Sequence, residues 1–355
     1  KTMLYIGLLC AAQCTSARQF YLMTVEPGSE FWSVYGHTAL VIDDDVYGFG
    51  VFSFEQENFY SSFVQNKMTY MVGHTDIASE IYWAEQDNRR LTLMPLKLSD
   101  ASKNDVVKYL RWHFQPENES YAYDYFLQNC ATKIRDILDK AMNGALKSNF
   151  IGSSSGGSYF SQTFPVKNQS VMTFGLAVAY GHAAYLPRTD WELMAFPMFL
   201  RERMNDPKMN KWHGPIHVEV DQNSSQVWLT FLQTHVFLIL FSLVLFIGLC
   251  TEVSRAATIK IYLFIQTLVG WGLLLLWLAT AHQMAAWNIQ LLLFSPVAAF
   301  VWRFPAVRRV LWLAVLVWFP LSIWQGSWYL WPLALINVLL LIFFGQQLSN
   351  RHSKV

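Results

Sequence analysis

Residues Tyr123–Asp136 read Tyr-Asp-Tyr-Phe-Leu-Gln-Asn-Cys-Ala-Thr-Lys-Ile-Arg-Asp, and this stretch decides which fold and which chemistry we expect. Asn129 is a good helix N-cap, and the apolar residues after it recur with helical spacing. The pattern predicts a helix that begins at Cys130 and runs to about Leu146. Because the first turn of a helix offers free N–H groups and a positive dipole end, this placement predicts a Cys130 pKa lowered from about 8.5 toward neutrality.

The second part of the chain has the composition of a membrane domain. The whole chain is 53% hydrophobic and 14% charged, with a mean hydropathy of +0.23, which is too apolar for an ordinary soluble protein. Apolar runs near the roughly 20 residues needed to cross a bilayer core recur along it. They cover Val227–Cys250, Ile259–Ala281, Ala286–Trp302, Val307–Ile323 and Trp328–Phe344. We therefore expect an all-α membrane bundle of about five transmembrane helices in residues 223–355, with the lipid bilayer as a partner.

The loops between these runs predict the orientation of the bundle. Arg255 and Lys260 lie before or at the start of the second run, three arginines lie before or at the start of the fourth, and Arg351 and Lys354 follow the fifth. The two remaining loops carry no Lys or Arg. Since positively charged loops stay in the cytoplasm, we expect a cytoplasmic C-terminus and an extracytoplasmic location for everything before Val227.

The first residues have the pattern of an export signal. Lys1 precedes an apolar stretch from Met3 to about Ala12, which is too short to span a membrane and is followed by small residues. We expect residues 1–17 to be a signal peptide cleaved near Ala17, with an uncleaved anchor as the alternative. Residues 18–222 then form one extracytoplasmic domain that contains a single cysteine, Cys130.

An unpaired thiol is unusual in an oxidising compartment, where cysteines are commonly joined in disulfides. Cys130 is therefore either a small buried hydrophobic residue or a nucleophile. The stretch Trp32–Ile42, Trp-Ser-Val-Tyr-Gly-His-Thr-Ala-Leu-Val-Ile, places His37 at the start of a strand-like run. A lone histidine is often structural, but a thiol with a distant histidine is the outline of a cysteine acyl-transfer enzyme. We expect Cys130 as nucleophile and His37 as base.

The extracytoplasmic domain is expected to be of the α+β class. A helix is predicted at Ser102–Phe114, capped by Ser99. The segment Leu193–Met204 fits either a helix on the bilayer surface or a core helix. Strands are predicted at Phe20–Val25, Thr38–Ile42 and Val46–Phe54, with a strand pair in Ile81–Pro95.

Three further residues are candidates for supporting roles. The hairpin of Thr38–Phe54 would bring Val51 or Ser53 roughly opposite His37, which makes Ser53 the polar candidate to orient the histidine. Tyr35 and Asn129 are candidates to stabilise an oxyanion, with packing and helix capping as their alternative roles.

The sequence does not indicate metal, nucleotide, serine-nucleophile or nucleic-acid chemistry. His213 and His217 are four residues apart, but Gly214 and Pro215 between them argue against a helical metal pair, and no Cys/His spacing suggests zinc. Phosphate-binding and dinucleotide motifs are absent from the sequence, and the Gly-Ser-Ser-Ser-Gly string at Gly152–Gly156 lies in a Gly/Ser loop and not at the strand-to-helix elbow of a serine nucleophile. The net charge is +1, and no basic stripe could neutralise phosphates. We expect no metal, no cofactor and no nucleic-acid partner.

Three strings together resemble the Lnb-type bacterial apolipoprotein N-acyltransferases. They are Trp32–Leu40, Val46–Phe54 with Asn58-Phe59 after it, and Tyr123–Asp136. The resemblance covers roughly Gln19–Phe150, and the layout of a periplasmic domain followed by a membrane bundle also fits. The order of histidine before cysteine, with asparagine just before the cysteine, is similar to the permuted papain-like (NlpC-like) fold of lecithin:retinol acyltransferase relatives.

The resemblance implies a specific reaction at a specific place. His37 would be the base and Cys130 the nucleophile that takes an acyl chain from a membrane phospholipid as a thioester. The acceptor would be the α-amine of a diacylglyceryl-cysteine lipoprotein, and the protein would lie in the bacterial inner membrane with its catalytic domain in the periplasm. Two alternatives remain: a membrane-anchored cysteine hydrolase (thioesterase, phospholipase or peptidase) that uses water as acceptor, and a non-enzymatic membrane sensor or scaffold.

Overall fold

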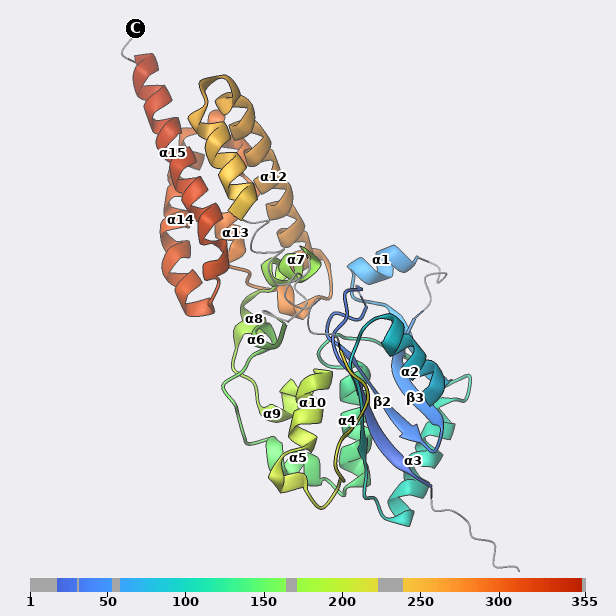
Figure 1. The fold of residues 1–355 in the computed structure, drawn as a ribbon. Helices are drawn as coiled ribbons and strands as arrows, with labels where there is room; N and C mark the ends of the chain where they lie inside the picture. The colour runs from blue at the N-terminus through green and yellow to red at the C-terminus, as the bar shows by residue number, and fades with distance from the viewer. Residues whose placement is uncertain (1–17, 31, 53–57, 164–170, 223–238, 353–355) are drawn as a thin grey trace, which may run out of the picture.

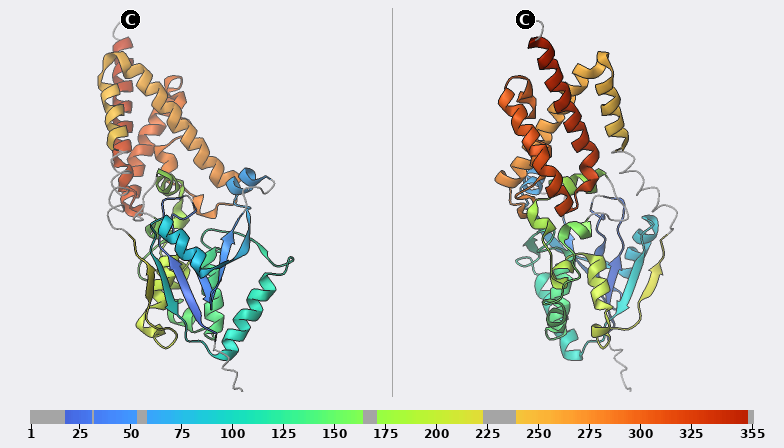
Figure 2. Two further views of the ribbon diagram at one scale, coloured as in Figure 1. Left: turned by 45° about the vertical axis from the view of Figure 1, so that its right-hand side comes forward. Right: turned by 90° about the vertical axis from the view of Figure 1, so that its left-hand side faces the viewer.

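The computed structural model describes residues 18–30, 32–52, 58–163, 171–222 and 239–352. In these residues the chain forms an antiparallel sheet domain followed by a helical bundle, and the bundle stands at one end of the sheet domain (Figures 1 and 2). The expected signal peptide, residues 1–17, lies outside the described residues, as does the candidate Ser53.

Seven strands form one sheet in the order β6-β4-β3-β2-β1-β5-β7, with each neighbouring pair antiparallel. The predicted hairpin is present, and Asp43 in its turn takes a positive φ of 57°. The strands are β1 Phe20–Val25, β2 His37–Ile42, β3 Asp45–Val51, β4 Thr69–Asp76, β5 Leu91–Pro95, β6 Ser120–Ala122 and β7 His217–Val220.

The strand pair predicted in Ile81–Pro95 is wrong in its first half. Ile77–Gln86 forms helix α2, and only Leu91–Pro95 is a strand. Asp76 caps α2 by accepting a hydrogen bond from the Ser79 N–H (2.9 Å). This cap starts the helix and overrides the strand-like apolar residues that follow.

Helices cover both faces of the sheet. On one face α3 (Asp100–His113) and α4 (Cys130–Ala141) pack against Leu40 and Phe49, whereas α2 covers the other face beside Ala39 and Val41. Successive side chains of a strand point to opposite faces. Even-numbered residues of β2 therefore face α4, and odd-numbered residues face α2.

Helix α4 begins where the sequence predicts. Asn129 is its N-cap: its Oδ1 accepts from the Thr132 N–H (2.8 Å), and the Thr132 hydroxyl accepts from the Asn129 N–H (2.8 Å). The helix ends at Ala141 and not near Leu146, because Asn143 and Gly144 take positive φ angles of 55° and 78°. A separate short helix, α5 (Ala145–Phe150), follows.

The remaining helices of the sheet domain are short. Helix α10 (Pro197–Met204) lies against β1 and α4, and Phe199, Leu200 and Met204 are buried, so the segment is a core helix and not a surface one. The others are α1 Phe59–Val64, α6 Tyr159–Thr163, α7 Val171–Ala179, α8 His182–Tyr185 and α9 Asp190–Leu193.

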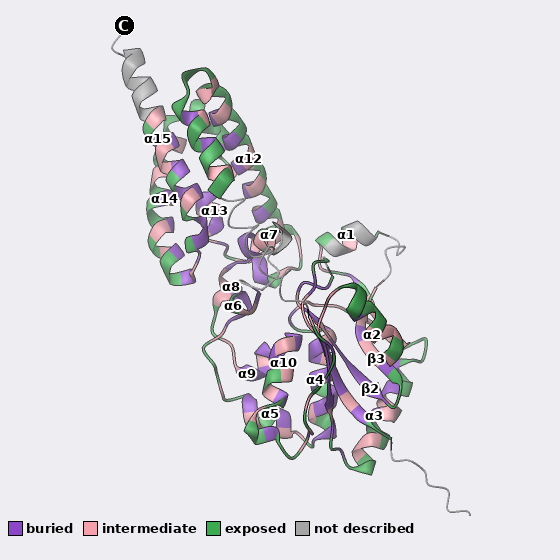
Figure 3. Cartoon of the chain, viewed as in Figure 1, coloured by how far each residue is buried: buried purple, intermediate pink, exposed green. Residues whose placement is uncertain are grey.

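Two helices of the bundle are long and apolar enough to cross a membrane, α12 (Glu252–Ala279) and α14 (Pro305–Gln325). Only 28% and 22% of their most apolar windows are buried, whereas a core helix of a soluble protein would be mostly buried. Figure 3 shows the exposed residues on the outer surface of these helices. The bundle also contains the helix Ile239–Cys250, α13 (Gln290–Leu293), the 3₁₀ turns Ala298–Trp302 and Trp328–Leu330, and α15 (Trp331–His352).

The predicted third span, Ala286–Trp302, is not one helix. It is interrupted at Pro296, which lacks an N–H and cannot continue a helical ladder. The carbonyl of Leu293 is left free by this break, and it accepts hydrogen bonds from Gln266 Nε2 (3.2 Å) and Asn337 Nδ2 (3.1 Å). Side chains of neighbouring helices thus provide the hydrogen bonds that the broken segment cannot form within itself. A low-dielectric environment requires such partners.

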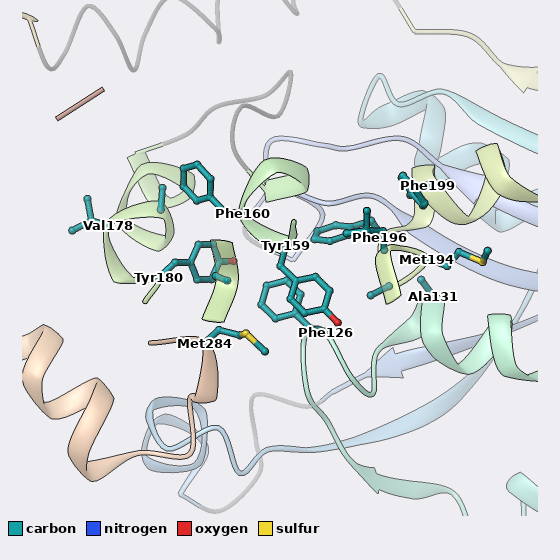
Figure 4. Packing of buried hydrophobic residues seen from close by; sticks show 14 of the residues in the cluster. Phe126, Ala131, Tyr159, Phe160, Val178, Tyr180, Met194, Phe196, Phe199 and Met284 are labelled. Carbon is teal, nitrogen blue, oxygen red and sulfur yellow. The ribbon is translucent and has the colours of Figure 1, made fainter. Parts of the chain in front are cut away.

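The sheet domain and the bundle share a junction. Gly181 N–H donates to the Met284 carbonyl (2.6 Å), and Asn288 Nδ2 donates to the Val178 carbonyl (2.8 Å). Figure 4 shows Tyr180 and Phe126 of the sheet domain in one apolar cluster with Met284, which follows α12. The junction therefore carries both buried apolar contact and backbone hydrogen bonds.

Candidate functional site

The thiol of Cys130 lies against a set of backbone N–H groups. Cys130 is the first residue of α4 and is half-buried. The backbone N–H groups of Thr38, Ala131 and Cys130 itself lie near enough to its sulfur to act on its pKa, which they lower. The Thr38 amide follows His37 directly in the chain. The thiol thus reaches the peptide next to the predicted base, across 92 residues of sequence.

The Thr38 amide is available because the sheet opens beside it. The pairing of β2 with β3 stops at Ala39↔Gly48, and β3 changes register between Phe49 and Val51. This bulge interrupts the pairing of β3 with β4 at the same level at which the pairing of β2 with β3 ends, so the Thr38 amide lies beyond the last pair of the β2–β3 ladder. The sulfur of Cys130, at the start of α4, lies near this amide.

Gly50 forms the bulge and adjoins the thiol. Its φ is +94°, a conformation that disfavours every residue except glycine. A β-carbon at this position would lie 3.9 Å from Cys130 Cβ and 3.9 Å from the ring of Tyr123. Continued for two residues, the register of the hairpin places Gly50 level with His37. Val51 thus lies one residue beyond the position level with His37, and the orienting role of Ser53 stays a prediction because that residue lies outside the described part of the chain.

The ring of His37 lies over Gly48. Its Nε2 is 3.2 Å from the position that a β-carbon of residue 48 would occupy, and the Ala39 side chain adjoins the same position. Ala39 faces α2, so the ring lies on the α2 side of the sheet. In the described part of the chain, no hydrogen bond joins the ring to Cys130. The structure brings the two residues together through the Thr38 peptide, with the imidazole turned away from the sulfur.

The segment that contains His37 and Cys130 matches a known family model. Residues 12–154 match the family model of the Lnb N-terminal periplasmic domain. The matched Lnb-type domain contains β1 to β6 and α1 to α5, and therefore both His37 and Cys130. No curated protein and no solved structure matches the chain.

Burial sets the protonation of the Cys130 thiol. It raises the Cys130 pKa above its usual value, although the three N–H groups act in the opposite direction. The lowered pKa predicted from the helix terminus is therefore wrong. The reason is that loss of water around the sulfur disfavours the thiolate by more than the three N–H groups favour it.

Burial also sets the protonation of the histidine. It lowers the His37 pKa to about 4, and the charge of Arg89 contributes in the same direction. At neutral pH the site therefore holds a neutral thiol and a neutral imidazole. A neutral imidazole can accept a proton, which is the state that a general base needs before reaction.

The lowered His37 pKa predicts a loss of stability in mild acid. Between pH 6.5 and pH 4 the unfolded chain binds a proton at His37 and the folded chain does not. Above pH 6.5 the ring is neutral in both states and the free energy of unfolding does not depend on its titration. Toward pH 4 the free energy of unfolding decreases by up to roughly 3 kcal/mol. His37→Gln is expected to lose less stability than the wild type when melting temperatures in detergent are compared at pH 7.5 and pH 4.5. Equal losses in both proteins would contradict this account.

The side-chain amide of Asn129 is hydrogen-bonded within the protein. Its Nδ2 donates to the carbonyls of Tyr125 (2.9 Å) and Ala195 (2.8 Å), which uses both amide hydrogens. Asn129 could therefore donate to an oxyanion only by breaking one of these bonds, and its oxyanion role stays a prediction. Its capping role is confirmed.

Tyr35 is packed among other aromatic side chains. Its ring packs edge-on against Phe196 (6.1 Å between centroids), and its hydroxyl faces those of Tyr180 and Thr163. Burial, followed by the neighbouring Tyr180, holds the Tyr35 pKa well above its usual value. These contacts give Tyr35 a packing role near the junction. The oxyanion role is not supported by this placement.

Sequence reasoning missed the residues that shape the site most closely, Thr38, Gly48, Gly50 and Tyr123. Two glycines in alternate positions of a predicted strand were the available signal, because glycine inside a strand often marks a bulge or a close approach. The Thr38 amide had no sequence signal, since it acts through its backbone. In the part of the chain that the structure describes, no three His, Cys, Asp or Glu side chains gather in a group that could hold a metal ion.

Proposed function

We propose that this protein is a membrane-anchored cysteine acyltransferase that N-acylates lipoproteins. The observation that supports it best is the placement of the Cys130 sulfur against the Thr38 amide, directly beside His37, within an Lnb-type periplasmic domain. A thiolate is both a good nucleophile and a good leaving group, so one site can accept an acyl chain and pass it on.

The first half-reaction forms the thioester. The His37 ring takes the thiol proton, and the sulfur attacks the ester carbonyl of a phospholipid. The ester C–O bond breaks, the leaving alkoxide takes the proton from His37, and a lysophospholipid departs. The N–H groups of Thr38, Ala131 and Cys130 support the negative sulfur that forms on the way.

The second half-reaction forms the amide. The α-amine of a diacylglyceryl-cysteine lipoprotein attacks the thioester carbonyl and loses a proton to His37. The C–S bond breaks, and the thiolate regains a proton as the triacylated lipoprotein leaves. Both halves use the same sulfur and the same imidazole, which is the pattern of ping-pong catalysis.

This mechanism includes a rotation of His37. The ring lies over Gly48 in the resting structure, whereas proton transfer needs hydrogen-bond reach to the sulfur. A turn about the Cα–Cβ bond alone leaves the ring on the α2 face, so the mechanism also requires a movement of the backbone at His37, the first residue of β2. Catalytic hydrogen bonds are often incomplete in free enzymes and form when substrate binds.

The proposed topology is a multi-pass protein of the bacterial inner membrane, with a periplasmic sheet domain and a cytoplasmic C-terminus. The last residue of α12, Ala279, lies at the junction. Its first residue, Glu252, lies at the far end of the bundle, and Arg255 follows it closely. Helix α14 begins with Pro305 at the end of the bundle far from the junction. Arg308 and Arg309, in its first turns, therefore also lie at the far end. This distribution of charge supports a cytoplasmic far end, with five crossings of which the third is broken.

Reconstitution tests the proposal directly. The purified full chain in phospholipid vesicles is mixed with a synthetic diacylglyceryl-cysteine lipopeptide, and mass spectrometry follows N-acyl lipopeptide and free fatty acid. The expected result is N-acylated peptide together with lysophospholipid in equal amounts. Fatty acid release without peptide acylation would identify a hydrolase instead, and no turnover of either kind would favour the sensor or scaffold.

A further inference from the structure

An apolar groove runs along the last turns of α12 in the bundle. Its volume is about 590 Å³, within the range of small-ligand sites. Side chains from α7 and α12 form its walls, and Val64, Phe241, Phe294 and Leu333 complete them. The lining is almost entirely carbon, so the groove offers a ligand burial of apolar surface and few hydrogen bonds.

The groove has the depth of one membrane leaflet. Its lining extends along α12 from Val269 to Thr280, which at 1.5 Å per residue is roughly 16 Å. Half of a bilayer's hydrocarbon core is about 15 Å. Thr280 marks the end next to the sheet domain, because the following residue, Ala281, donates its N–H to the Gln65 carbonyl (3.1 Å).

Hydrogen bonds connect this end of the groove to the thiol site. The Val64 carbonyl accepts from His282 Nε2 (2.9 Å), so the other ring nitrogen of His282 accepts from the Tyr125 hydroxyl. The Tyr125 carbonyl accepts in turn from Asn129, the residue before Cys130. A molecule with its tail in the groove would thus place its polar end on the side of the sheet domain, where these hydrogen bonds lead toward Cys130.

We propose that the groove holds one acyl chain of a membrane phospholipid, and that this phospholipid is the acyl donor of the thiol site. The occupant follows from three properties: a lining that is almost entirely carbon, a depth of one leaflet, and an end beside the sheet domain. Each buried methylene contributes favourable free energy, so the groove selects for chain length. The donor role rests on the proposed function, whereas occupancy by lipid does not.

Two glycines allow a test that adds bulk only to the groove. Gly175 on α7 and Gly272 on α12 both line it, and a β-carbon at either position would meet no protein atom within 4 Å. Gly272→Leu therefore fills the groove and leaves the packing of the protein intact. Leu278→Trp is the control, because Leu278 is exposed on the opposite side of α12.

Photolabelling reports occupancy without turnover. The full chain carrying Cys130→Ser is placed in vesicles with a phosphatidylethanolamine that bears a diazirine in one acyl chain, and adducts are mapped by peptide mass spectrometry. Adducts are expected on groove residues such as Phe174 and Leu276. Gly272→Leu is expected to reduce these adducts about tenfold, because the bound chain would lose the burial of roughly two methylenes. Leu278→Trp is expected to leave the adducts unchanged. Equal labelling of lipid-facing residues such as Leu313, unaffected by Gly272→Leu, would overturn the proposal.

Chain-length preference then tests the donor role in the chain that retains Cys130. Gly272→Leu is expected to slow N-acylation from long-chain donors about tenfold more than from short-chain donors, because only long chains reach residue 272. Loss of labelling without any change in chain preference would show that the bound lipid is not the donor. Groove labelling in a chain with no acyltransferase activity would overturn the proposed function and leave lipid binding by the groove established.

Discussion

Cys130→Ser is expected to abolish N-acylation in the reconstituted assay, by at least about 10³-fold in rate. A serine hydroxyl is far less acidic than a thiol, and His37, with a pKa of about 4, is a weak base. The oxygen therefore cannot be activated by the same imidazole. Serine retains a small acceptor for the N–H groups of Thr38 and Ala131, so the variant should fold.

Two measurements make this result specific. The melting temperature of Cys130→Ser should match that of the wild type within about 2 °C, since a single buried atom changes and the neighbouring N–H groups keep an acceptor. Cys250→Ser is the matched control: Cys250 is the other free cysteine in the described residues and is exposed in the bundle. Retained acylation in Cys130→Ser, or an equal loss in Cys250→Ser, would refute the proposed nucleophile.

Gly181→Ala should weaken the junction between the sheet domain and the bundle by about 3 kcal/mol. A β-carbon at residue 181 would overlap the Ala286 carbonyl oxygen and lie 2.6 Å from its carbonyl carbon. Backbone atoms cannot turn aside as a flexible side chain can. The substitution would also displace the Gly181 N–H from the Met284 carbonyl and loosen the apolar cluster around Tyr180.

Hydrogen exchange at residues 176–186 and 281–290 measures this effect, with faster exchange expected at both segments. Gly175→Ala provides the control, because a β-carbon there meets nothing and alanine favours helix over glycine by about 1 kcal/mol. If the junction holds the groove at the thiol site, Gly181→Ala also slows acylation in proportion to junction opening. Unchanged exchange in Gly181→Ala would mean that the two parts are not held together as the structure has them.

Local signals in the sequence predicted much of the sheet domain. Asn129 and Ser99 cap the helices expected of them, and the Asp43–Asp45 turn joins the expected strands. These features depend on neighbouring residues, so they are readable from a single chain. The capped helix α2 was missed because apolar residues at Ile81–Trp83 suit a strand equally well.

The bundle was predicted less completely. Apolar runs identified its extent, and α14 continues through Pro320. The break at Pro296 differs because the backbone of residues 294–296 packs against Gly270, where a β-carbon would overlap the Phe294 carbonyl oxygen. Which of two prolines interrupts a helix depends on the partner that satisfies the freed backbone groups, and such partners are distant in sequence.

The sequence by itself determined the two reactive residue types, the start of α4 at Cys130 and the apolar second half of the chain. These follow from capping, periodicity and composition, which are local properties. Only the tertiary structure decided that the sulfur meets the Thr38 amide, that the His37 ring rests over Gly48, and that burial raises the thiol pKa. Those outcomes depend on the Gly50 bulge and on the loss of water around the sulfur, and both are set by contacts between segments far apart in the chain.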